Sequence, residues 1–425
     1  MIEKKNKAMI VYFIYYLAYS SIYIARMNFS VVSALFESAG TLNKTQVGLI
    51  GSIFSFAYAA AKIPGGYIGD RKPAQKVIVF GLLVTALSNL LIGFFPAFYS
   101  IAILWGLNAI GQSMLWGPTL RNVNHYFTGE KAKVMCQFLS SSVAVGSILG
   151  LLVAGMCSTA FGVAACFFIP GVITMLMALI IRVAVPGWKE SAQRAGQKEA
   201  KQQGHQGVTA SKEGLTGAKE AQQGSKRQSV RSFLCDRSFH EMILPAISHG
   251  MIKDNVNVWL AVYFVDTFGI DLNAIVYYIF FIPLFGLVGR IIYPIVYKVI
   301  KNDYMMSILA FVLCILLLVP LCTPVVTPIV AMLCLGMISA MVSVINIHML
   351  SMFPSRYARS GNVSLAASFM DVLTYGGAGL GSLFFGALIQ KLGYISMFLV
   401  WVMVSVVSIV CLALARKRHL KKSEM

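Results

Sequence analysis

The chain has 425 residues, of which 58% are hydrophobic and only 12% are charged, and its mean hydropathy is +0.75. Soluble domains carry about 25% charged residues, so this composition excludes a soluble enzyme and a disordered chain. The net charge of +19 comes from 35 Lys and Arg against 16 Asp and Glu, in short basic runs between apolar segments. That distribution is typical of membrane proteins and argues against a nucleic-acid partner.

Twelve apolar segments are long enough to cross a hydrocarbon core of about 30 Å as helices. In chain order they are residues 8–33, 46–66, 76–96, 99–121, 132–157, 162–185, 241–264, 272–298, 304–321, 326–350, 361–389 and 394–415. Residues 187–240 are rich in Gln, Gly, Lys and Ser without apolar periodicity, which predicts a flexible linker. The sequence therefore predicts an all-α membrane protein with two pseudo-symmetric six-helix bundles, 1–186 and 241–425, joined by the linker 187–240.

Basic residues gather on one side of the predicted spans. That side carries Lys4, Lys5, Lys7, Arg71, Lys72, Lys76, Lys131, Lys133, Lys298, Lys301, Arg356, Arg359, Arg416, Lys417, Arg418 and the linker. The other side has almost no positive charge beyond Lys44 and Lys391. By the positive-inside rule, both termini and the linker are expected in the cytoplasm. The first apolar run lacks a small-residue cleavage site, so we expect a span there rather than a signal peptide. The short termini suit a bacterial inner membrane.

A short motif follows the second predicted span. Residues 66–71 read Gly-Tyr-Ile-Gly-Asp-Arg, which resembles the Gly-x-x-x-Asp-Arg loop of the major facilitator superfamily. The resemblance implies two halves that rock about a site near the membrane midplane. It also implies that Asp70 and Arg71 act as a conformational lock rather than as substrate ligands. The corresponding stretch of the second half, from Gly286 to Lys298, has no Asp or Glu at the acidic position.

A set of polar and aromatic residues inside the spans narrows the resemblance. Its members are Tyr19, Tyr23, Arg26, Tyr58, Lys62, Trp116, Arg121, Lys253, His348 and Tyr375. Their order and spacing are similar to those of the organophosphate:phosphate antiporter family, over essentially the whole chain outside the linker. Lys253 stands where the glycerol-3-phosphate exchangers of that family carry Arg. The resemblance thus implies an anion site and leaves the particular organophosphate open.

Ionisable groups inside a membrane span are costly and therefore mark candidate functional sites. Tyr19, Tyr23 and Arg26 fall at i, i+4 and i+7, so two phenols and a guanidinium share one helix face. Arg can bind a phosphate with two parallel hydrogen bonds. The resemblance favours Arg26 as a substrate ligand; a snorkelling Arg, or one paired with a carboxylate, is the alternative. Tyr58 and Lys62 also share a face, and Lys62 either contacts substrate, gates the cavity or snorkels.

The seventh and eleventh spans carry the remaining polar stripes. His249, Lys253 and Asn257 are spaced at i, i+4 and i+8, and the repeat logic places Lys253 opposite Arg26 across a cavity. The alternative is a structural pair of Lys253 with Asp254 or Asp371. On the eleventh span the stripe is Ser364, Ser368, Asp371 and Tyr375. Asp371 has three open roles: neutralising Lys253, carrying a proton, or hydrogen bonding substrate hydroxyls.

Three further residues have both a functional and a structural interpretation. His348 is a candidate substrate or proton-carrying residue, although a lone helical His is more often packed and hydrogen bonded. Trp116 and Tyr375 either contact the substrate or serve as core aromatics. Arg121 lies near a cytoplasmic helix end, where it is expected to pair with backbone carbonyls or acidic loop residues and to take part in gating. The eight cysteines show no metal spacing or disulfide framework, so we expect no metal or cofactor.

The resemblance and the charge pattern together predict a secondary transporter rather than an enzyme. The expected reaction is exchange of a sugar phosphate or glycerol phosphate for inorganic phosphate, by alternating access in a monomer. Two other functions remain open. One is proton-coupled symport of an organic anion through Asp371 or His348. The other is a transporter-like membrane sensor of sugar phosphates.

Overall fold

The computed structural model describes residues 2–127, 129–185, 236–271, 274–275, 278, 281–323, 325–357 and 363–423. Nearly all of these residues are helical, and the described part of the chain contains no strand. Most of the predicted linker, residues 187–235, lies outside the described residues. Its last residues, from Arg237 onward, are already helical.

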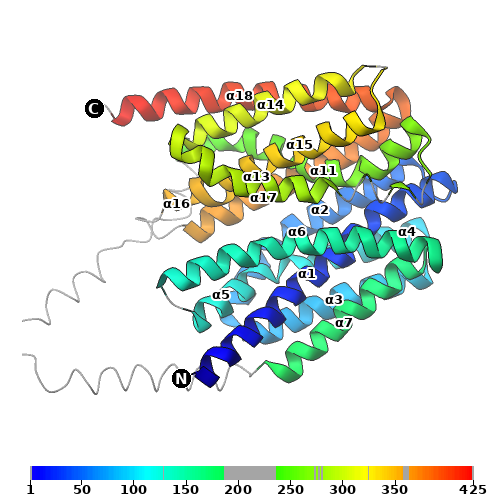
Figure 1. Cartoon of the computed structure of the whole chain (residues 1–425), viewed down its shortest axis with the longest axis vertical. Helices are drawn as coiled ribbons and strands as arrows, with labels where there is room; N and C mark the ends of the chain where they lie inside the picture. The colour runs from blue at the N-terminus through cyan, green and yellow to red at the C-terminus, as the bar shows by residue number, and fades with distance from the viewer. Residues whose placement is uncertain are drawn as a thin grey trace, which may run out of the picture.

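The helices fall into an N-terminal and a C-terminal group (Figure 1). The N-terminal group is α1 (Ile2–Ser38), α2 (Lys44–Arg71), α3 (Ala74–Phe94), α4 (Phe98–Ser113), α5 (Trp116–Tyr126), α6 (Gly129–Ala160) and α7 (Ala165–Ala184). The C-terminal group is α11 (Arg237–Phe268), α13 (Phe281–Ile300), α14 (Asp303–Leu321), α15 (Pro328–Ile347), the π-helical turn η1 (His348–Met352), α16 (Phe353–Ser355), α17 (Val363–Leu392) and α18 (Tyr394–Ser423).

Among the described residues, eleven segments are long and apolar enough to cross a membrane. Helix α11 is the twelfth long segment and falls outside that set, because its middle carries Lys253, Asp254, Asn255 and Asn257. The prediction of an all-α membrane protein with twelve crossings is confirmed in this sense. The polar residues in the middle of α11 indicate that this part of the helix faces the interior of the bundle rather than lipid.

Two of the predicted spans contain irregular turns, and one local expectation was wrong. The fourth span is interrupted at Met114 and Leu115, between α4 and α5. The tenth span ends in the π-helical turn η1 and the short α16, so it is not one regular helix. The Gly-x-x-x-Asp-Arg stretch forms the last turns of α2 rather than a loop, since α2 continues to Arg71. Lys62 therefore lies well inside its helix.

Local sequence signals explain several helix boundaries. The Asn43 side chain caps α2 by accepting a hydrogen bond from the Gln46 backbone N–H. The Gln46 side chain in turn accepts a hydrogen bond from the Asn43 backbone N–H. Thr327 caps α15 with Pro at its first position. Helix α11 ends at Gly269, whose φ of 62° is the left-handed conformation that glycine adopts without strain.

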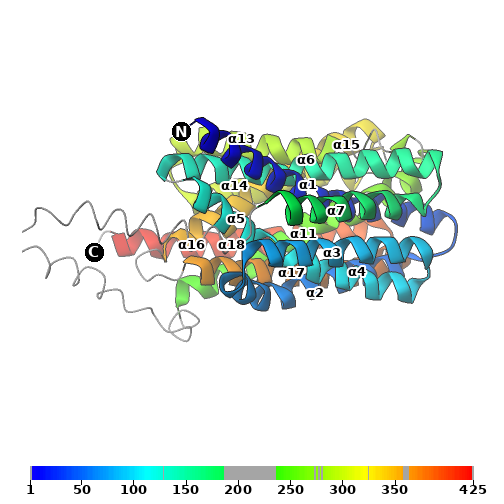
Figure 2. The same ribbon diagram turned by 90° about the horizontal axis from the view of Figure 1, so that it is seen from below.

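Both chain termini lie at one end of the helical bundle, which we call the terminus end (Figure 1). The turns after α1 and α6 and the end of α11 at Gly269 lie at the other end, which we call the opposite end. The two halves meet through three helix pairs, α1 with α11, α2 with α17 and α6 with α13. A view from below shows the same long, roughly parallel packing of both groups (Figure 2). This arrangement puts α1, α2, α11 and α17 around the centre of the molecule.

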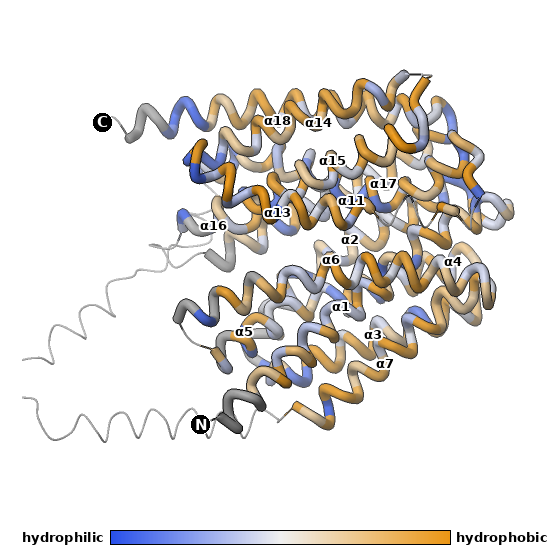
Figure 3. The backbone as a smooth tube through the Cα atoms, viewed as in Figure 1, coloured by the Kyte–Doolittle hydropathy of each residue, from blue (hydrophilic) through white to orange (hydrophobic). Residues whose placement is uncertain are grey.

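The outer helices present apolar side chains on their exposed faces. Leu179, Leu316 and Val410 are each more than half exposed, and the outer helices are coloured mostly as hydrophobic in Figure 3. Exposed apolar bands of this extent suit contact with lipid chains. The chain is a multi-pass integral membrane protein, and polar groups buried between its halves are the candidates for function.

Candidate functional site

Helix α1 is held by amide side chains of the N-terminal half. Asn89 of α3 and Asn108 of α4 are fully buried, and each donates to the Ala25 carbonyl at 3.2 Å. Buried amides are stabilising only when satisfied, so these bonds fix the rotation of α1 in the bundle. The next residue along α1 is Arg26, which is turned toward the C-terminal half.

Helices α11 and α17 approach each other closely because glycines line their contact. A Cβ at Gly250 would lie 1.8 Å from the Thr374 carbonyl oxygen, and one at Gly377 would lie 2.1 Å from that of Ile247. Only residues without a Cβ allow this backbone separation. The contact brings the charged residues of α11 beside Tyr375 of α17.

Arg26 and Lys253 lie on either side of one carboxylate. The Nη2 atom of Arg26 is 3.7 Å from Asp254 Oδ2, and the Nζ atom of Lys253 is 3.2 Å from Asp254 Oδ1. Asp254 is only 14% exposed, and its Oδ2 atom accepts no hydrogen bond from the residues that the structure describes. The expected opposition of Arg26 and Lys253 is thus present, with a carboxylate between them.

Tyr375 joins the two cations from the other side. Its hydroxyl lies 3.3 Å from Arg26 Nη1, and Lys253 Nζ lies 4.8 Å from the centre of its ring. The ring stacks on Tyr58 with a centroid separation of 4.0 Å. The Arg26 guanidinium also lies 4.6 Å from the centre of the Phe54 ring and 5.7 Å from that of Tyr23. Aromatic faces attract these cations without neutralising them.

Lys62 and Asp371 form an ion pair across the two halves. Lys62 Nζ of α2 is 2.9 Å from Asp371 Oδ2 of α17, and the two side chains are 14% and 19% exposed. Lys62 also lies 5.2 Å from the centre of the Tyr58 ring. Of the open roles for Asp371, neutralising a lysine is the one present here, but the lysine is Lys62 rather than Lys253. Lys253 has Asp254 instead.

The cations exceed the carboxylates at this site. Arg26, Lys62 and Lys253 stand against Asp254 and Asp371, which leaves a surplus of one positive charge. A surplus of positive charge away from bulk water favours an anionic ligand. The arrangement has paired cations, phenol donors and no assembled nucleophile or general base among its described residues.

A small cavity of about 50 Å³ lies beside Arg26, on the side of the opposite end. It is lined by Arg26, Phe54, Ser55, Trp105, Asp254 and Asn257, among others. A water molecule in the liquid occupies about 30 Å³, whereas pockets for small ligands measure about 300–1,000 Å³. In this conformation the halves are therefore too close together for a sugar phosphate, and binding one requires them to separate.

The opposite end is closed by contacts between the two halves. Lys44 of α2 pairs with Glu37 of its own half at 3.0 Å and with Asp266 of α11 at 2.8 Å. Asp266 also accepts a hydrogen bond from the Tyr394 hydroxyl at 2.8 Å. This ion network separates the central site from that end of the molecule.

Other predicted residues lie beside the central cluster or elsewhere. Tyr19 is buried and its ring centroid is 5.8 Å from that of Tyr23 and 4.9 Å from that of Trp116, so Trp116 joins the cluster through Tyr19. Arg121 donates to the Lys72 carbonyl at 2.7 Å, next to the α2–α3 turn. The side chains of Asp70, Arg71 and Ser364 lie outside the described residues.

The two candidate histidines, His249 of the α11 stripe and His348 at the end of the tenth span, lie away from the central cluster. His348 is fully buried, and its Nδ1 atom is 2.7 Å from the Ser307 hydroxyl of α14, with its ring 5.3 Å from that of Tyr304. His249 is also fully buried, with Nε2 3.2 Å from the Val342 carbonyl of α15. Both therefore contact the interior of the C-terminal half, which is the structural interpretation for a lone helical His.

Two features of the site escaped the sequence reasoning. Asp254 was considered only as a partner of Lys253, whereas it also faces Arg26. Ser30 of α1 donates to the Asn257 carbonyl of α11, a bond across the halves that no motif announces. The signal for Asp254 was available, because an ionisable residue inside a span faces the interior of the bundle and pairs with other charged groups there. Within the described residues, no group of three His, Cys, Asp or Glu is placed to hold a metal.

Comparisons with known proteins bear on the family and the fold. A family model described as Major Facilitator Superfamily matches residues 8–372. In fold, the chain is similar to a bacterial homologue of the human lysosomal transporter Spinster in an inward-facing and occupied conformation. The TM-score is 0.72 at 16% identity, with 97% of each chain covered.

Two curated relatives share part of the sequence. The chain is 25% identical over 183 residues to a "Probable hexose phosphate transport protein" of Chlamydia trachomatis, which covers 43% of this chain and 40% of that one. It is 31% identical over 102 residues to the "Membrane sensor protein UhpC" of Escherichia coli, covering 24% and 23%. The chain thus spans well under half the length of the relatives it matches. Neither relative is an enzyme by name.

Proposed function

Because the chain belongs to the Major Facilitator Superfamily, we propose that it exchanges a phosphorylated small metabolite for inorganic phosphate across a membrane. The substrate class is a sugar phosphate or a glycerol phosphate. Partial similarity to a hexose phosphate transport protein supports this class. The one observation that carries the proposal is the pair of cations, Arg26 and Lys253, on either side of Asp254.

Asp254 occupies the place that a phosphate would take. A phosphate group near pH 7 carries a charge of about −1.5 to −2 and three acceptor oxygens. It can therefore satisfy Arg26 and Lys253 better than one carboxylate, whose Oδ2 atom accepts no hydrogen bond in this conformation. On binding, the phosphate takes over both cations and the Tyr375 hydroxyl, and Asp254 moves aside.

The Lys62–Asp371 pair is the second component of the mechanism. It joins α2 to α17 on the terminus side of Arg26, so it must separate when the cavity opens toward that end. Substrate that enters there meets a lysine and a carboxylate, which offer an ion pair to phosphate and an acceptor to sugar hydroxyls. Re-forming the pair closes the cavity behind the substrate.

The charge surplus explains why the two fluxes are coupled. An occluded site with an unneutralised cation is costly in a low-dielectric interior. The carrier therefore crosses between its two conformations more readily with an anion bound than empty. Exchange follows from this preference without any other energy source.

The proposal also fixes the setting. The chain acts as a monomer with an N-terminal bundle within 1–186 and a C-terminal bundle that begins with α11 at Arg237, and the stretch between them forms a cytoplasmic linker. Both termini lie in the cytoplasm, as the basic residues of the terminus end favour. The membrane is a bacterial inner membrane. Asp70, Arg71 and Arg121 act in gating near that end.

A sensor of sugar phosphates is the second candidate, because one relative is named as a membrane sensor. The same site would then bind the organophosphate without net exchange. Proton-coupled symport is the third, with Asp254 or Asp371 as the proton carrier. These alternatives differ from the main proposal in one measurable property, which is phosphate counterflow.

The test is phosphate counterflow in proteoliposomes. Purified protein is reconstituted with unlabelled phosphate inside, and uptake of radiolabelled phosphate is followed with a panel of organophosphates as competitors. We expect counterflow that one class of phosphate ester inhibits. Arg26→Ala and Lys253→Ala should each reduce it by at least about tenfold, because each removes a charged hydrogen-bond donor.

One control variant and one further site variant make this test specific. Arg182→Ala removes an exposed arginine at the end of α7, outside the site, and should leave counterflow unchanged. Asp254→Asn should make unlabelled phosphate a stronger competitor of labelled phosphate uptake, because the carboxylate that competes for Arg26 and Lys253 is gone. Absence of counterflow from folded wild-type protein would overturn the exchange proposal. Binding of sugar phosphate without counterflow would favour the sensor, and uptake driven by a proton gradient alone would favour symport.

A further inference from the structure

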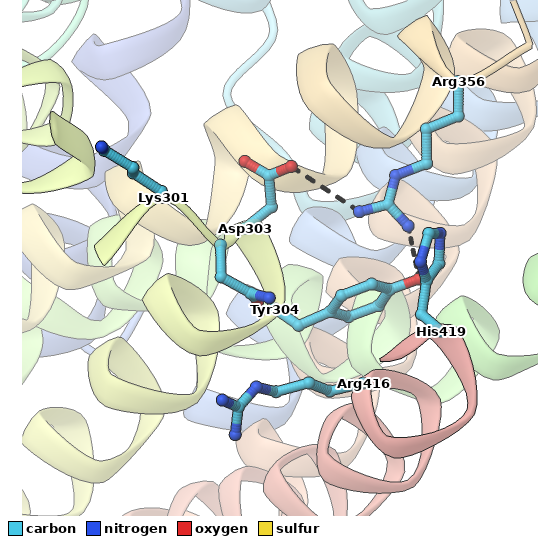
Figure 4. Close-up of a pocket in the computed structure, with 7 residues that line it drawn as sticks. Lys301, Asp303, Tyr304, Arg356, Arg416 and His419 are labelled. Atoms are coloured by element: carbon cyan, nitrogen blue, oxygen red, sulfur yellow. Dashed lines mark hydrogen bonds and ion pairs between the residues drawn. The ribbon is translucent and has the colours of Figure 1, made fainter. Parts of the chain in front are cut away.

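A second basic pocket lies at the terminus end of the C-terminal half. It has a volume of about 150 Å³ and is lined by residues of the α13–α14 connection, α16 and α18 (Figure 4). Three of its side chains are cations, Lys301, Arg356 and Arg416. None of them belongs to the central site, and the transport mechanism above leaves them without a role.

The one carboxylate of this pocket is already engaged. Asp303 accepts a hydrogen bond from the Tyr293 hydroxyl at 3.0 Å and pairs with Arg356 at 3.6 Å. Arg356 also donates to the Tyr304 hydroxyl, and its guanidinium lies 4.5 Å from the centre of the Tyr304 ring. Asp303 and Tyr304 thus hold Arg356 in place, and the side chains converge in the upper part of Figure 4.

The other two cations, Lys301 and Arg416, are not paired with the pocket's one carboxylate, which is engaged by Arg356. The Nε atom of Arg416 is buried and makes no hydrogen bond with any described residue. Lys301 is exposed, and it has a left-handed φ of 51° in the turn between α13 and α14. Three cations against one carboxylate leave a surplus of two positive charges, before any protonation of His419. A buried, unsatisfied guanidinium nitrogen beside such a surplus points to an anionic ligand.

The pocket also lies where a membrane meets water. Helix α13 ends at Ile300, α14 begins at Asp303, and the apolar crossing of α18 ends at His419. Exposed apolar side chains continue from this level along the outer faces, with Val299 at 83%, Leu313 at 43% and Leu414 at 50% exposure. A ligand here can place an anionic group in the pocket and acyl chains against α14 and α18.

We propose that this pocket binds the phosphate group of an anionic ligand at the membrane interface, either a phospholipid headgroup or free inorganic phosphate. Arg416 and Lys301 supply the charge that is not already neutralised. The Arg356 guanidinium, fixed by Asp303 and Tyr304, supplies directed donors at one wall. The proposal does not depend on the transported substrate, because it uses no residue of the central site.

Native mass spectrometry of the purified full-length chain tests this. The protein is titrated with phosphatidylglycerol, then with phosphatidylcholine, and finally with phosphatidylglycerol in the presence of inorganic phosphate. Arg416→Gln and Lys301→Asn are compared with Arg418→Gln, a matched loss of charge on the same helix. Arg418 is outside the pocket and pairs with Glu241. Asn at position 301 tolerates the left-handed backbone.

We expect tighter binding of phosphatidylglycerol than of phosphatidylcholine. Arg416→Gln and Lys301→Asn should each weaken it by about fivefold, the effect of one basic residue at a charged membrane surface. Arg418→Gln should change it by less than about twofold, because that charge is already paired. Millimolar phosphate is added to the wild type and to Arg416→Gln. If it displaces lipid from the wild type but not the lipid that still binds to Arg416→Gln, the pocket also binds free phosphate. If it displaces nothing, the ligand is the lipid headgroup. Equal weakening by Arg416→Gln and Arg418→Gln, or no preference for the anionic lipid, would overturn the proposal.

Discussion

Of the three helix pairs through which the two halves meet, a six-plus-six plan makes two equivalent: the seam of α2 with α17 and the seam of α6 with α13. On the α2–α17 seam, Thr45 donates to Gln390 near the opposite end, and Lys62 pairs with Asp371 nearer the terminus end. On the α6–α13 seam, Arg290 donates to the Ser140 carbonyl at 3.1 Å. Among the described side chains, the first seam is thus closed over most of its length, and the second is held by a charged hydrogen bond near its middle.

Glycine explains how the α2–α17 seam closes. A Cβ at Gly48 would lie 2.3 Å from the Ser382 carbonyl oxygen and 3.1 Å from the Gly386 Cα atom. Small residues let helices approach until van der Waals contact of their backbones stabilises them. The two seams are equivalent in the six-plus-six plan, but they differ in how closely their helices pack. The α2–α17 seam should therefore control access to the site.

The largest effect is expected from filling the backbone contact at Gly48. Gly48→Ala forces a shift that costs about 1–3 kcal/mol in the closed arrangement, so the closed state should lose population and counterflow should fall by about tenfold. A cysteine at Ser55, which lines the cavity beside Arg26, should then react faster with an impermeant thiol reagent from the opposite end.

Gly66→Ala is the matched control on the same helix. A Cβ at Gly66 would meet nothing within 4 Å, so counterflow and Ser55→Cys reactivity should stay at the parent level. Equal losses in Gly48→Ala and Gly66→Ala would mean that helix propensity, not the seam, is responsible, and the comparison of the two seams would fail.

The next largest effect concerns the charged latch of the same seam. Asp371→Asn leaves Lys62 without its carboxylate, and an unpaired cation in this setting costs about 1–3 kcal/mol. We expect counterflow to fall by about fivefold to tenfold. Lys62→Gln combined with Asp371→Asn should recover part of that loss if the pair acts mainly as a latch. A double variant no better than Asp371→Asn would instead assign one of the two residues directly to the substrate.

How far the sequence predicts this site depends on the kind of contact. The positions of Arg26, Lys253, Tyr58 and Tyr375 follow from helix periodicity and the repeat plan, and the structure brings them together. The choice of partner does not follow. The sequence places Asp371 on a polar face of its span but does not say which lysine it meets. Only the packing of α2 on α17 pairs it with Lys62.

Buried histidines show the other limit. His249 occurs at a spacing that places it on a polar stripe, and His348 was a candidate substrate or proton-carrying residue, yet both are hydrogen bonded inside the C-terminal half. Helix rotation decides which side of a stripe faces the centre, and rotation is set by neighbours such as α14 and α15. Periodicity in one helix carries no information about those neighbours.

A smaller effect is expected on the α6–α13 seam. Arg290→Gln keeps a neutral donor toward Ser140 but loses the charged hydrogen bond, a difference of about 0.5–1 kcal/mol. Counterflow should therefore fall by about threefold, and inhibition by organophosphates should keep the same rank order. A loss as large as that of Gly48→Ala would show that the two seams are equal after all, and Arg290→Lys would report whether charge or geometry is required.

The smallest effect concerns the ion network at the opposite end. Lys44 bridges Glu37 and Asp266, and all three side chains are about one fifth exposed. Partly exposed pairs contribute about 0.2–1 kcal/mol each and are screened by salt. Lys44→Gln should therefore slow counterflow by about twofold at low ionic strength, and the difference from wild type should shrink in 0.5 M salt. Lys391→Gln, at an exposed basic residue of the same end, should show neither change. A salt-independent loss at Lys44 would mean that this residue acts through packing at the start of α2, which would extend the α2–α17 seam to the very end of the molecule.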